Sequence, residues 1–175
     1  MENNRCEVAS TVEHAILLGN HDLTIDEKGR LLIPVEFRRA LEATNDGANF
    51  VLVNGIDGRI WLYPERVYKA FVNQRQQDLT PSYDRLDFED IYFGMANPVE
   101  SDKQGRVLIP EKMLKDSNIN RDVTVRGAGT YMKIWNRADW EARKSALQKK
   151  QMAEYAAIFG SSGLPDAGEV SRTSG

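Results

Sequence analysis

Polar and apolar residues alternate along this chain in short blocks, and the blocks predict strands and helices in a fixed order. Residues 21–25 alternate with a period of two, which is typical of a half-buried strand. Residues 26–29 have the composition of a tight turn, in which Asp accepts backbone hydrogen bonds and Gly takes a positive φ. Residues 30–33 are then expected to return as the partner strand.

A helix is expected next, because Pro34 stands where a first helical residue is favoured and an apolar stripe follows, namely Phe37, Ala40 and Leu41. Residues 49–54 and 59–63 predict two more strands, and the two glycines within residues 55–58 suit a hairpin between them. A second helix is expected from Pro64, with an apolar face of Val67, Ala70 and Phe71.

The most informative feature is an internal repeat. Residues 26–34 (DEKGRLLIP) return 76 residues later as residues 102–110 (DKQGRVLIP), with six of nine positions identical. The strands that follow return at a shorter offset, since Gly127 follows Gly55 by 72 residues. The first repeat is therefore expected to hold a loop four residues longer, and residues 44–47 have the turn composition for it.

The repeats suggest a domain organisation. Residues 1–15 are expected to be a mobile extension, residues 16–78 the first repeat, and residues 96–140 the second. Residues 79–95 are expected as a linking helix, whose apolar positions are Phe88, Ile91, Tyr92 and Met95. Asn136 is a suitable N-cap for a C-terminal helix over residues 136–159, and the Gly- and Ser-rich tail 160–175 is expected to be disordered.

Composition narrows the class of protein. The chain has 175 residues, 41% apolar residues, a net charge of −3 and a pI near 5.5. No apolar run approaches the roughly 20 residues of a membrane span, so we expect a cytoplasmic protein with no membrane contact. Cys6 is the single cysteine, and the only histidines, His14 and His21, lack supporting ligands, so no metal or cofactor is expected.

One residue of the repeated turn is not explained by local folding. A turn needs Asp and Gly, but neither the turn nor the strand after it requires the arginine that follows the glycine in both copies, Arg30 and Arg106. One interpretation is that each arginine pairs with its own turn aspartate, Asp26 or Asp102, and fastens the turn. The other is a binding role. The two are compatible, since an aspartate can orient an arginine that also touches a ligand.

Two such turns, each with Gly before the Arg and Leu-Ile-Pro after it, resemble the MraZ family of bacterial transcription regulators. The wider kinship is to AbrB-like swapped-hairpin DNA-binding domains. The resemblance covers roughly residues 18–159. It implies an α+β fold, mainly β with helices, in which two AbrB-like halves form a pseudo-two-fold β-barrel with flanking helices.

The resemblance also implies a function. A MraZ-like regulator would assemble into a ring and bind repeated boxes in double-stranded DNA upstream of the division and cell-wall gene cluster and its own gene, in association with the nucleoid. By position, the DNA-contacting residues are Asp26, Lys28, Arg30, Asp102 and Arg106. Gln104 replaces the lysine equivalent to Lys28, so Lys103 is expected to supply charge one residue earlier.

Elementary chemistry fits this expectation if a β-turn enters the major groove, where arginine can donate two hydrogen bonds to guanine O6 and N7. Residues 22–42 hold four basic and five acidic side chains, so one repeat has no net positive field. A ring would present many copies of the turns and raise their effective concentration over tandem sites. We therefore expect binding that is weak per subunit and steep in protein concentration.

Two other classes of function compete with this interpretation. An enzyme could use Asp26 and Asp102 as acid and base, but the sequence shows no nucleophile with a histidine partner and no phosphate-cradling loop, so no catalytic residue is assigned. An oligomeric interaction protein of the same fold without DNA binding is the closer alternative, and the acidic net charge favours it slightly.

Overall fold

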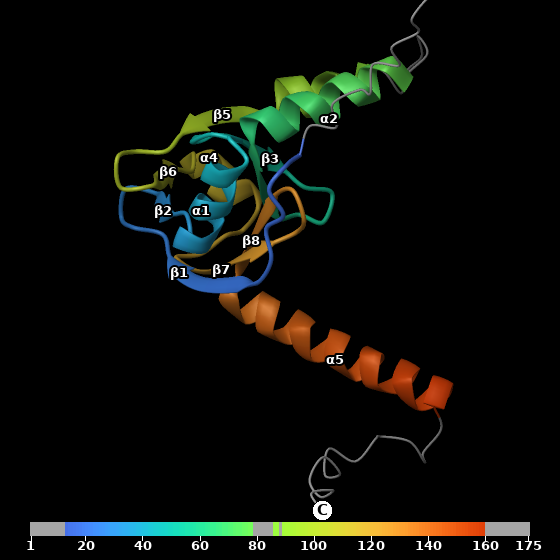
Figure 1. Cartoon of the computed structure of the whole chain (residues 1–175). Coiled ribbons are helices and arrows are strands. Elements are labelled where there is room, and N and C mark those ends of the chain that lie inside the picture. Colours follow the sequence, from blue (N-terminus) through green and yellow to red (C-terminus); the bar gives the residue numbers. More distant parts are fainter. Residues whose placement is uncertain (1–12, 79–85, 88, 160–175) are drawn as a thin grey trace, which may run out of the picture. The chain divides into compact units, whose positions relative to one another are not determined.

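The computed structural model describes residues 13–78, 86–87 and 89–159 of the chain. Most of the expected N-terminal extension, the tail 160–175 and residues 79–85 and 88 of the expected linking helix lie outside the described residues. The chain divides into two units, Met1–Arg137 and Ala138–Gly175. All the strands belong to the first unit (Figure 1).

The two repeats form the same series of elements. The first contains β1 (Asn20–Thr24), β2 (Arg30–Leu32), α1 (Val35–Ala43), β3 (Asn49–Asn54), β4 (Ile60–Pro64) and α2 (Glu65–Asp78). The second contains β5 (Asn97–Glu100), β6 (Arg106–Leu108), α4 (Glu111–Asp116), β7 (Asp122–Gly127), β8 (Met132–Asn136) and α5 (Arg137–Phe159). The strands and helices expected within the two repeats are present, although Pro34 and Pro64 precede their helices instead of starting them.

The repeats exchange strands. Six strands form one antiparallel sheet in the order β1-β7-β8-β4-β3-β5, and a separate ribbon pairs β2 with β6. β1 therefore pairs with β7 of the second repeat, and β5 pairs with β3 of the first. The expectation that residues 30–33 pair with the strand before them was wrong, because the tight turn directs β2 away from β1 and onto β6 (Figure 1).

The α+β class and the two-repeat architecture are confirmed, but the sheet is not a closed barrel. β1 and β5 are its two edges, with β2 and β6 in the other sheet. A closed barrel would require the two edge strands, β1 and β5, to pair with each other. Instead, the chain turns at the repeated motif after each of these strands and continues into the β2–β6 ribbon. The ribbon covers one face of the open sheet instead.

The main core lies between this ribbon and the sheet. The inward side chains of the ribbon, Leu31 and Val107, are completely buried, as are Leu52, Leu62 and Ile134 of the sheet. Helices α1 and α4 add side chains to the same core, including Phe37, Leu41 and Met113. The expected stripe of α1 is thus confirmed.

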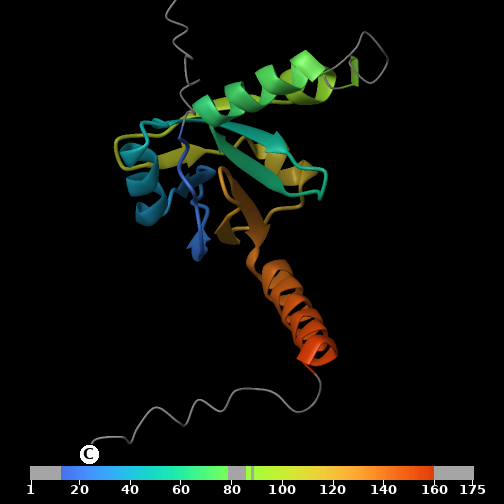
Figure 2. The same ribbon diagram turned by 45° about the vertical axis from the view of Figure 1, so that its right-hand side comes forward.

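A second apolar cluster lies on the opposite face of the sheet, where α2 runs along the β3–β4 hairpin (Figure 2). Its buried members are Val51, Val53, Tyr63, Val67, Tyr68 and Val72. Ala70, which the sequence places on the buried face of α2, is exposed, and Phe71 is partly buried. The buried face of α2 is therefore rotated towards Tyr68 and Val72.

Three of the four extra residues of the first repeat lie in a helix, and the fourth lies in the β3–β4 hairpin loop, residues 55–59, which is one residue longer than the matching loop 128–131. Helix α1 has nine residues and α4 has six, while the segments 44–48 and 117–121 that follow them are equally long. Asn45 and Asn118 occupy matching positions after the helices, with φ of 56° and 49°. The assignment of the insertion to residues 44–47 was wrong because turn composition marks the helix end in both repeats.

Two helical segments differ from the expected amphipathic pattern. In the linking segment, Asp90–Gly94 is a π-helix in which Met95 N donates to Asp90 O, and Ile91 and Met95 are exposed. The wider π turn moves residues three and four apart off one face. In α5, the large apolar side chains Met152 and Tyr155 are likewise exposed. Among the described residues, no helix has the length and apolarity to cross a membrane.

The residues before β1 are held by a buried carboxylate. Asp46 accepts hydrogen bonds from Ala15 N at 2.8 Å, Thr44 Oγ1 at 2.7 Å and His14 Nδ1 at 2.9 Å. Burial raises the pKa of Asp46, but these donors outweigh it and leave the pKa below its ordinary value. His14 and Ala15, placed in the N-terminal extension by the sequence, are thus anchored to the end of α1.

Candidate nucleic-acid interface

The first repeated turn is built around the side chain of Asp26. Its Oδ1 accepts hydrogen bonds from the backbone N of Lys28 and of Arg30, both at 2.9 Å. Its Oδ2 accepts one from Arg30 Nε at 2.7 Å. Gly29 has φ of +77°, a conformation that glycine adopts without steric cost, and its N donates to Asp26 O. One carboxylate therefore closes the turn and fixes the arginine.

The second turn repeats this geometry almost atom for atom. Asp102 Oδ1 accepts from the backbone N of Gln104 at 2.9 Å and of Arg106 at 3.0 Å, and Oδ2 accepts from Arg106 Nε at 2.8 Å. Arg106 Nη2 also approaches Oδ2 at 2.7 Å. Gly105 has φ of +78°. The expected pairing of each arginine with its own aspartate is confirmed.

These contacts fix the charges of the two aspartates. The backbone hydrogen bond from Arg30 is the largest cause of a lowered pKa at Asp26. The side-chain hydrogen bond from Arg106 is the largest cause at Asp102, whose pKa falls to about 2. Both carboxylates are therefore ionised at neutral pH. Arginine carries five N–H donors, so pairing through one edge leaves donors for a further acceptor.

The β2–β6 ribbon carries both turns. Arg30 lies opposite Leu108 and Leu32 lies opposite Arg106, so the two arginines are diagonal neighbours on the outer face of the ribbon. Diagonal neighbours are roughly 7–8 Å apart in antiparallel pairs. Each turn is also bound to the other repeat, because Ile109 N donates to Gly29 O and Ile33 N donates to Gly105 O, both at 2.9 Å.

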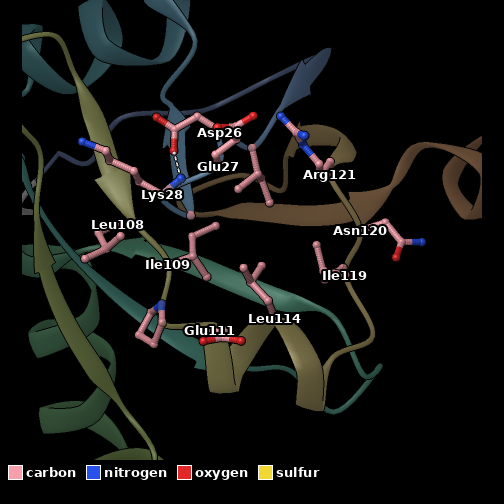
Figure 3. A pocket seen from close by; sticks show the side chains of 13 residues that line it. Asp26, Glu27, Lys28, Leu108, Ile109, Glu111, Leu114, Ile119, Asn120 and Arg121 are labelled. Atoms are coloured by element: carbon pink, nitrogen blue, oxygen red, sulfur yellow. Dashed lines mark hydrogen bonds between the residues drawn. The ribbon is translucent and has the colours of Figure 1, made fainter.

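A pocket lies beside each turn. The pocket at the first turn has a volume of about 770 Å³, and Figure 3 shows Leu114 between Ile109 and Ile119 on its apolar side, with Lys28 and Arg121 at the rim. The matching pocket at the second turn has a volume of about 380 Å³. The motif thus forms part of a shallow surface at both ends of the ribbon.

The two pockets differ at several equivalent positions, and Arg38 occupies one of them. Leu114 N donates to Pro110 O as Arg38 N donates to Pro34 O, so Arg38 is the counterpart of Leu114. Arg38 lies over the second turn: a Cβ placed on Gly105 would be 2.7 Å from Arg38 Cδ. Its Nε donates to Ile33 O at 3.2 Å. The second turn, where Gln104 replaces a lysine, has a cation from the first repeat beside it.

All six residues predicted to contact DNA belong to the two turns, and Lys28 and Lys103 are exposed. Two further cations next to the turns, Arg38 and Arg121, were missed by sequence reasoning. Alignment of the repeats could have flagged Arg38, since it faces a leucine at the same offset. Arg121 likewise aligns with a neutral residue, Ala48, but the alignment does not place either arginine beside a turn, because that depends on the exchange of strands.

Within the described residues, no group of three His, Cys, Asp or Glu side chains is arranged to hold a metal ion. The two histidines contact other groups. His14 bonds to Asp46, and His21 lies 3.8 Å from Glu36 and edge-on to the ring of Phe37.

Fold and site together define a class: tandem-repeat α+β proteins in which two halves exchange strands and display paired arginine turns on a short ribbon. A family model described as MraZ protein, antitoxin-like, matches residues 16–88 and again residues 92–158. The chain belongs to the MraZ family.

Three relatives from this family align with the chain over most of their own length. The transcriptional regulator MraZ of Clostridium tetani is 32% identical over 140 residues, which cover 79% of this chain and 95% of the relative. That of Moorella thermoacetica is 33% identical over 144 residues, with the same coverage. That of Clostridium acetobutylicum is 31% identical over 140 residues, again covering 79% and 95%.

Proposed function

We propose that this protein is a transcriptional regulator that binds double-stranded DNA through the outer face of the β2–β6 ribbon. The observation that carries the proposal is the pair of arginines, Arg30 and Arg106, each held through Nε by an ionised aspartate on one small two-fold surface. The names of the curated relatives support the regulatory role.

The ribbon suits the major groove, which is about 12 Å wide and admits a two-stranded β-ribbon. An arginine whose Nε edge is held by a carboxylate presents its remaining N–H groups outward, where guanine O6 and N7 accept two hydrogen bonds. Asp26 and Asp102 thereby orient the arginine side chains towards the base edges.

Phosphate contacts come from the cations around the turns. Lys28 and Arg121 lie at the first turn, and Lys103 and Arg38 at the second. This local charge offsets the net charge of −3, which by itself does not favour DNA binding. Charges close to the groove contribute most, because salt screens the interaction between exposed charges beyond about 10 Å at ordinary ionic strength.

We further propose that the protein acts as a homo-oligomer, in the form of a ring, on repeated boxes upstream of its own gene and of the division and cell-wall gene cluster. Two arginines give modest affinity, and several copies on tandem sites raise the effective concentration of each turn. The fraction of DNA bound then rises steeply with protein concentration. In this proposal the protein is cytoplasmic and associates with the nucleoid. A forced monomer that held the fragment as tightly as the assembly would contradict this.

The test is a titration of the protein onto a labelled fragment from upstream of its own gene and onto a scrambled fragment, at several salt concentrations. Arg30→Ala and Arg106→Ala are titrated in parallel, with light scattering on each variant. The expected result is a preference for the native fragment that both substitutions abolish while the assembly keeps its mass.

The same titration decides between the two candidate functions. Equal affinity for both fragments, indifferent to the arginines, would overturn DNA readout. If the substitutions instead changed the mass of the assembly, the turns would serve protein contacts, which is the alternative that the acidic net charge favours.

A further inference from the structure

The outer face of the ribbon carries two leucines as well as two arginines. Leu32 is 40% exposed and Leu108 is 55% exposed, whereas their strand neighbours Leu31 and Val107 are completely buried. The alternation is that of a strand with one face in the core. The face proposed to meet DNA is therefore half apolar.

Each leucine lies beside the turn of the other repeat. Leu108 is the cross-strand partner of Arg30, and Leu32 is that of Arg106. A Cβ placed on Gly29 would lie 3.7 Å from Leu108 Cδ1, and Figure 3 shows Leu108 next to Lys28. The face thus presents an arginine and a leucine side by side, twice, related by the pseudo-two-fold axis.

Single exposed leucines are common on protein surfaces and need no explanation. These two differ because they occupy equivalent positions in the repeats and both lie among cations. A second copy of this chain would have to cover Arg30 and Arg106 in order to cover the leucines, at the expense of desolvating two guanidinium groups. The major groove accepts both, since it offers guanine acceptors and the thymine methyl group.

We infer that Leu32 and Leu108 contact the C5-methyl groups of thymines next to the guanines read by Arg30 and Arg106. This inference rests on the proposed function. Thymine is the only base that presents a methyl group in the major groove. The ribbon would then select sites in which a guanine and a thymine are neighbours, so that the leucines determine specificity beside the arginines.

The test removes the methyl groups without changing the hydrogen bonds of the bases. The fragment from upstream of the gene is prepared with thymine and with uracil in its place, and both forms are titrated with the full chain. Burying one methyl group corresponds to about a fourfold change in affinity. We expect the wild type to lose roughly fourfold per contact on the uracil form.

Two variants complete the experiment. The double variant Leu32→Ala/Leu108→Ala should bind the thymine form as weakly as the uracil form, because its contact is already absent. Ile56→Ala is the matched control: Ile56 is 93% exposed in the β3–β4 turn, outside the ribbon. This variant should keep the full thymine preference.

The outcomes separate the inference from the proposed function. A wild type that prefers the native over the scrambled fragment but binds thymine and uracil forms equally would overturn the inference alone. A wild type without preference for the native fragment would overturn the proposed function. A loss of assembly mass in the double variant, with the thymine preference intact, would assign the leucines to contacts between copies and also overturn the inference.

Discussion

At the scale of single residues, the aspartate of each turn has two roles. One oxygen of Asp26 accepts two backbone N–H groups and closes the turn, while the other holds Arg30 Nε. Because a single side chain connects the backbone to the guanidinium, the arginine is positioned by the turn itself. Preorganisation of this kind reduces the entropy that an arginine loses on binding.

This arrangement predicts a pH dependence of stability. The pKa of Asp102 is lowered from its ordinary value of 3.8 to about 2, so its contribution to the free energy of unfolding is complete above about pH 4. That contribution is lost as the pH falls towards 2. Thermal unfolding of Asp102→Asn between pH 5 and 2 should therefore show a lower stability at pH 5 and a flatter dependence on pH than the wild type.

Asp26→Asn should change the profile in the same direction, because the pKa of Asp26 is also lowered. If both variants lost stability with falling pH as steeply as the wild type does, the two aspartates would not stabilise the turns through their ionised carboxylates.

Individual contacts were predictable from the sequence only where they were local. The pairing of Asp26 with Arg30 spans four residues and follows from the turn. The hydrogen bonds of His14 and Ala15 with Asp46 span more than 30 residues, and nothing in the local sequence pattern indicates them. Whether the two arginines meet DNA remains a prediction.

At the scale of elements, α1 contributes to a turn that belongs to the other repeat. Arg38 extends from α1 over Gly105, where the second turn lacks the lysine of the first. Helix α4 offers Leu114 at the equivalent place, so the first turn has no such cation from its helix. Strand exchange therefore makes each turn a product of both repeats.

A phosphate contact from Arg38 can be measured through salt. Replacing one phosphate-binding cation lowers the slope of log affinity against log salt by about 0.9 per contact. Arg38→Leu copies the residue at the equivalent position of α4, and we expect it to reduce the slope by about one per bound turn. Adding Gln104→Lys to this variant should restore the slope by returning a cation to the same turn.

Arg75→Leu is the matched control, because Arg75 is exposed on α2, which packs on the opposite face of the sheet. It should leave the slope unchanged. An unchanged slope in Arg38→Leu as well would remove Arg38 from the interface.

The elements and the β3–β4 hairpin were predictable, but the pairing of strands from different repeats was not. Periodicity gave the order of strands and helices, since a half-buried strand and an amphipathic helix have distinct periods. It paired residues 30–33 with the preceding strand because local reasoning favours the nearest partner. The exchange that places β2 on β6 depends on pairs of residues 74 to 78 positions apart in the sequence. Turn composition also gave no indication that α1 is longer than α4.

At the scale of the whole molecule, strand exchange gives one chain a pseudo-two-fold surface. The sheet order β1-β7-β8 and β4-β3-β5 is symmetric about the β8–β4 pair, and the ribbon lies across the same pseudo-axis. Such symmetry matches a duplex, whose two strands are related by two-fold axes, and dimeric DNA-binding proteins use the same correspondence. Here a single chain supplies both halves.

The net charge of the molecule is a poor guide to this surface. The chain carries 26 acidic and 23 basic side chains. Four of the six turn residues expected to contact DNA are cationic, and the two aspartates are engaged by arginines. Affinity should therefore arise from local geometry and from repetition of the surface in an assembly, and fall steeply with added salt.

The most direct test of base reading keeps the positive charge at each turn but removes the planar arrangement of donors that a guanidinium group has. The ratio of affinities for the native and scrambled fragments is measured for the wild type and for Arg30→Lys/Arg106→Lys, with assembly mass checked by light scattering. A bidentate arginine contact gives about 1–3 kcal/mol of discrimination, so the wild type should prefer the native fragment by about tenfold or more. The lysine variant should show a clearly smaller ratio than the wild type, because an ammonium group lacks the planar paired donors of a guanidinium and the main remaining source of preference is the contacts of Leu32 and Leu108. A ratio as large as that of the wild type would contradict base reading by the turns.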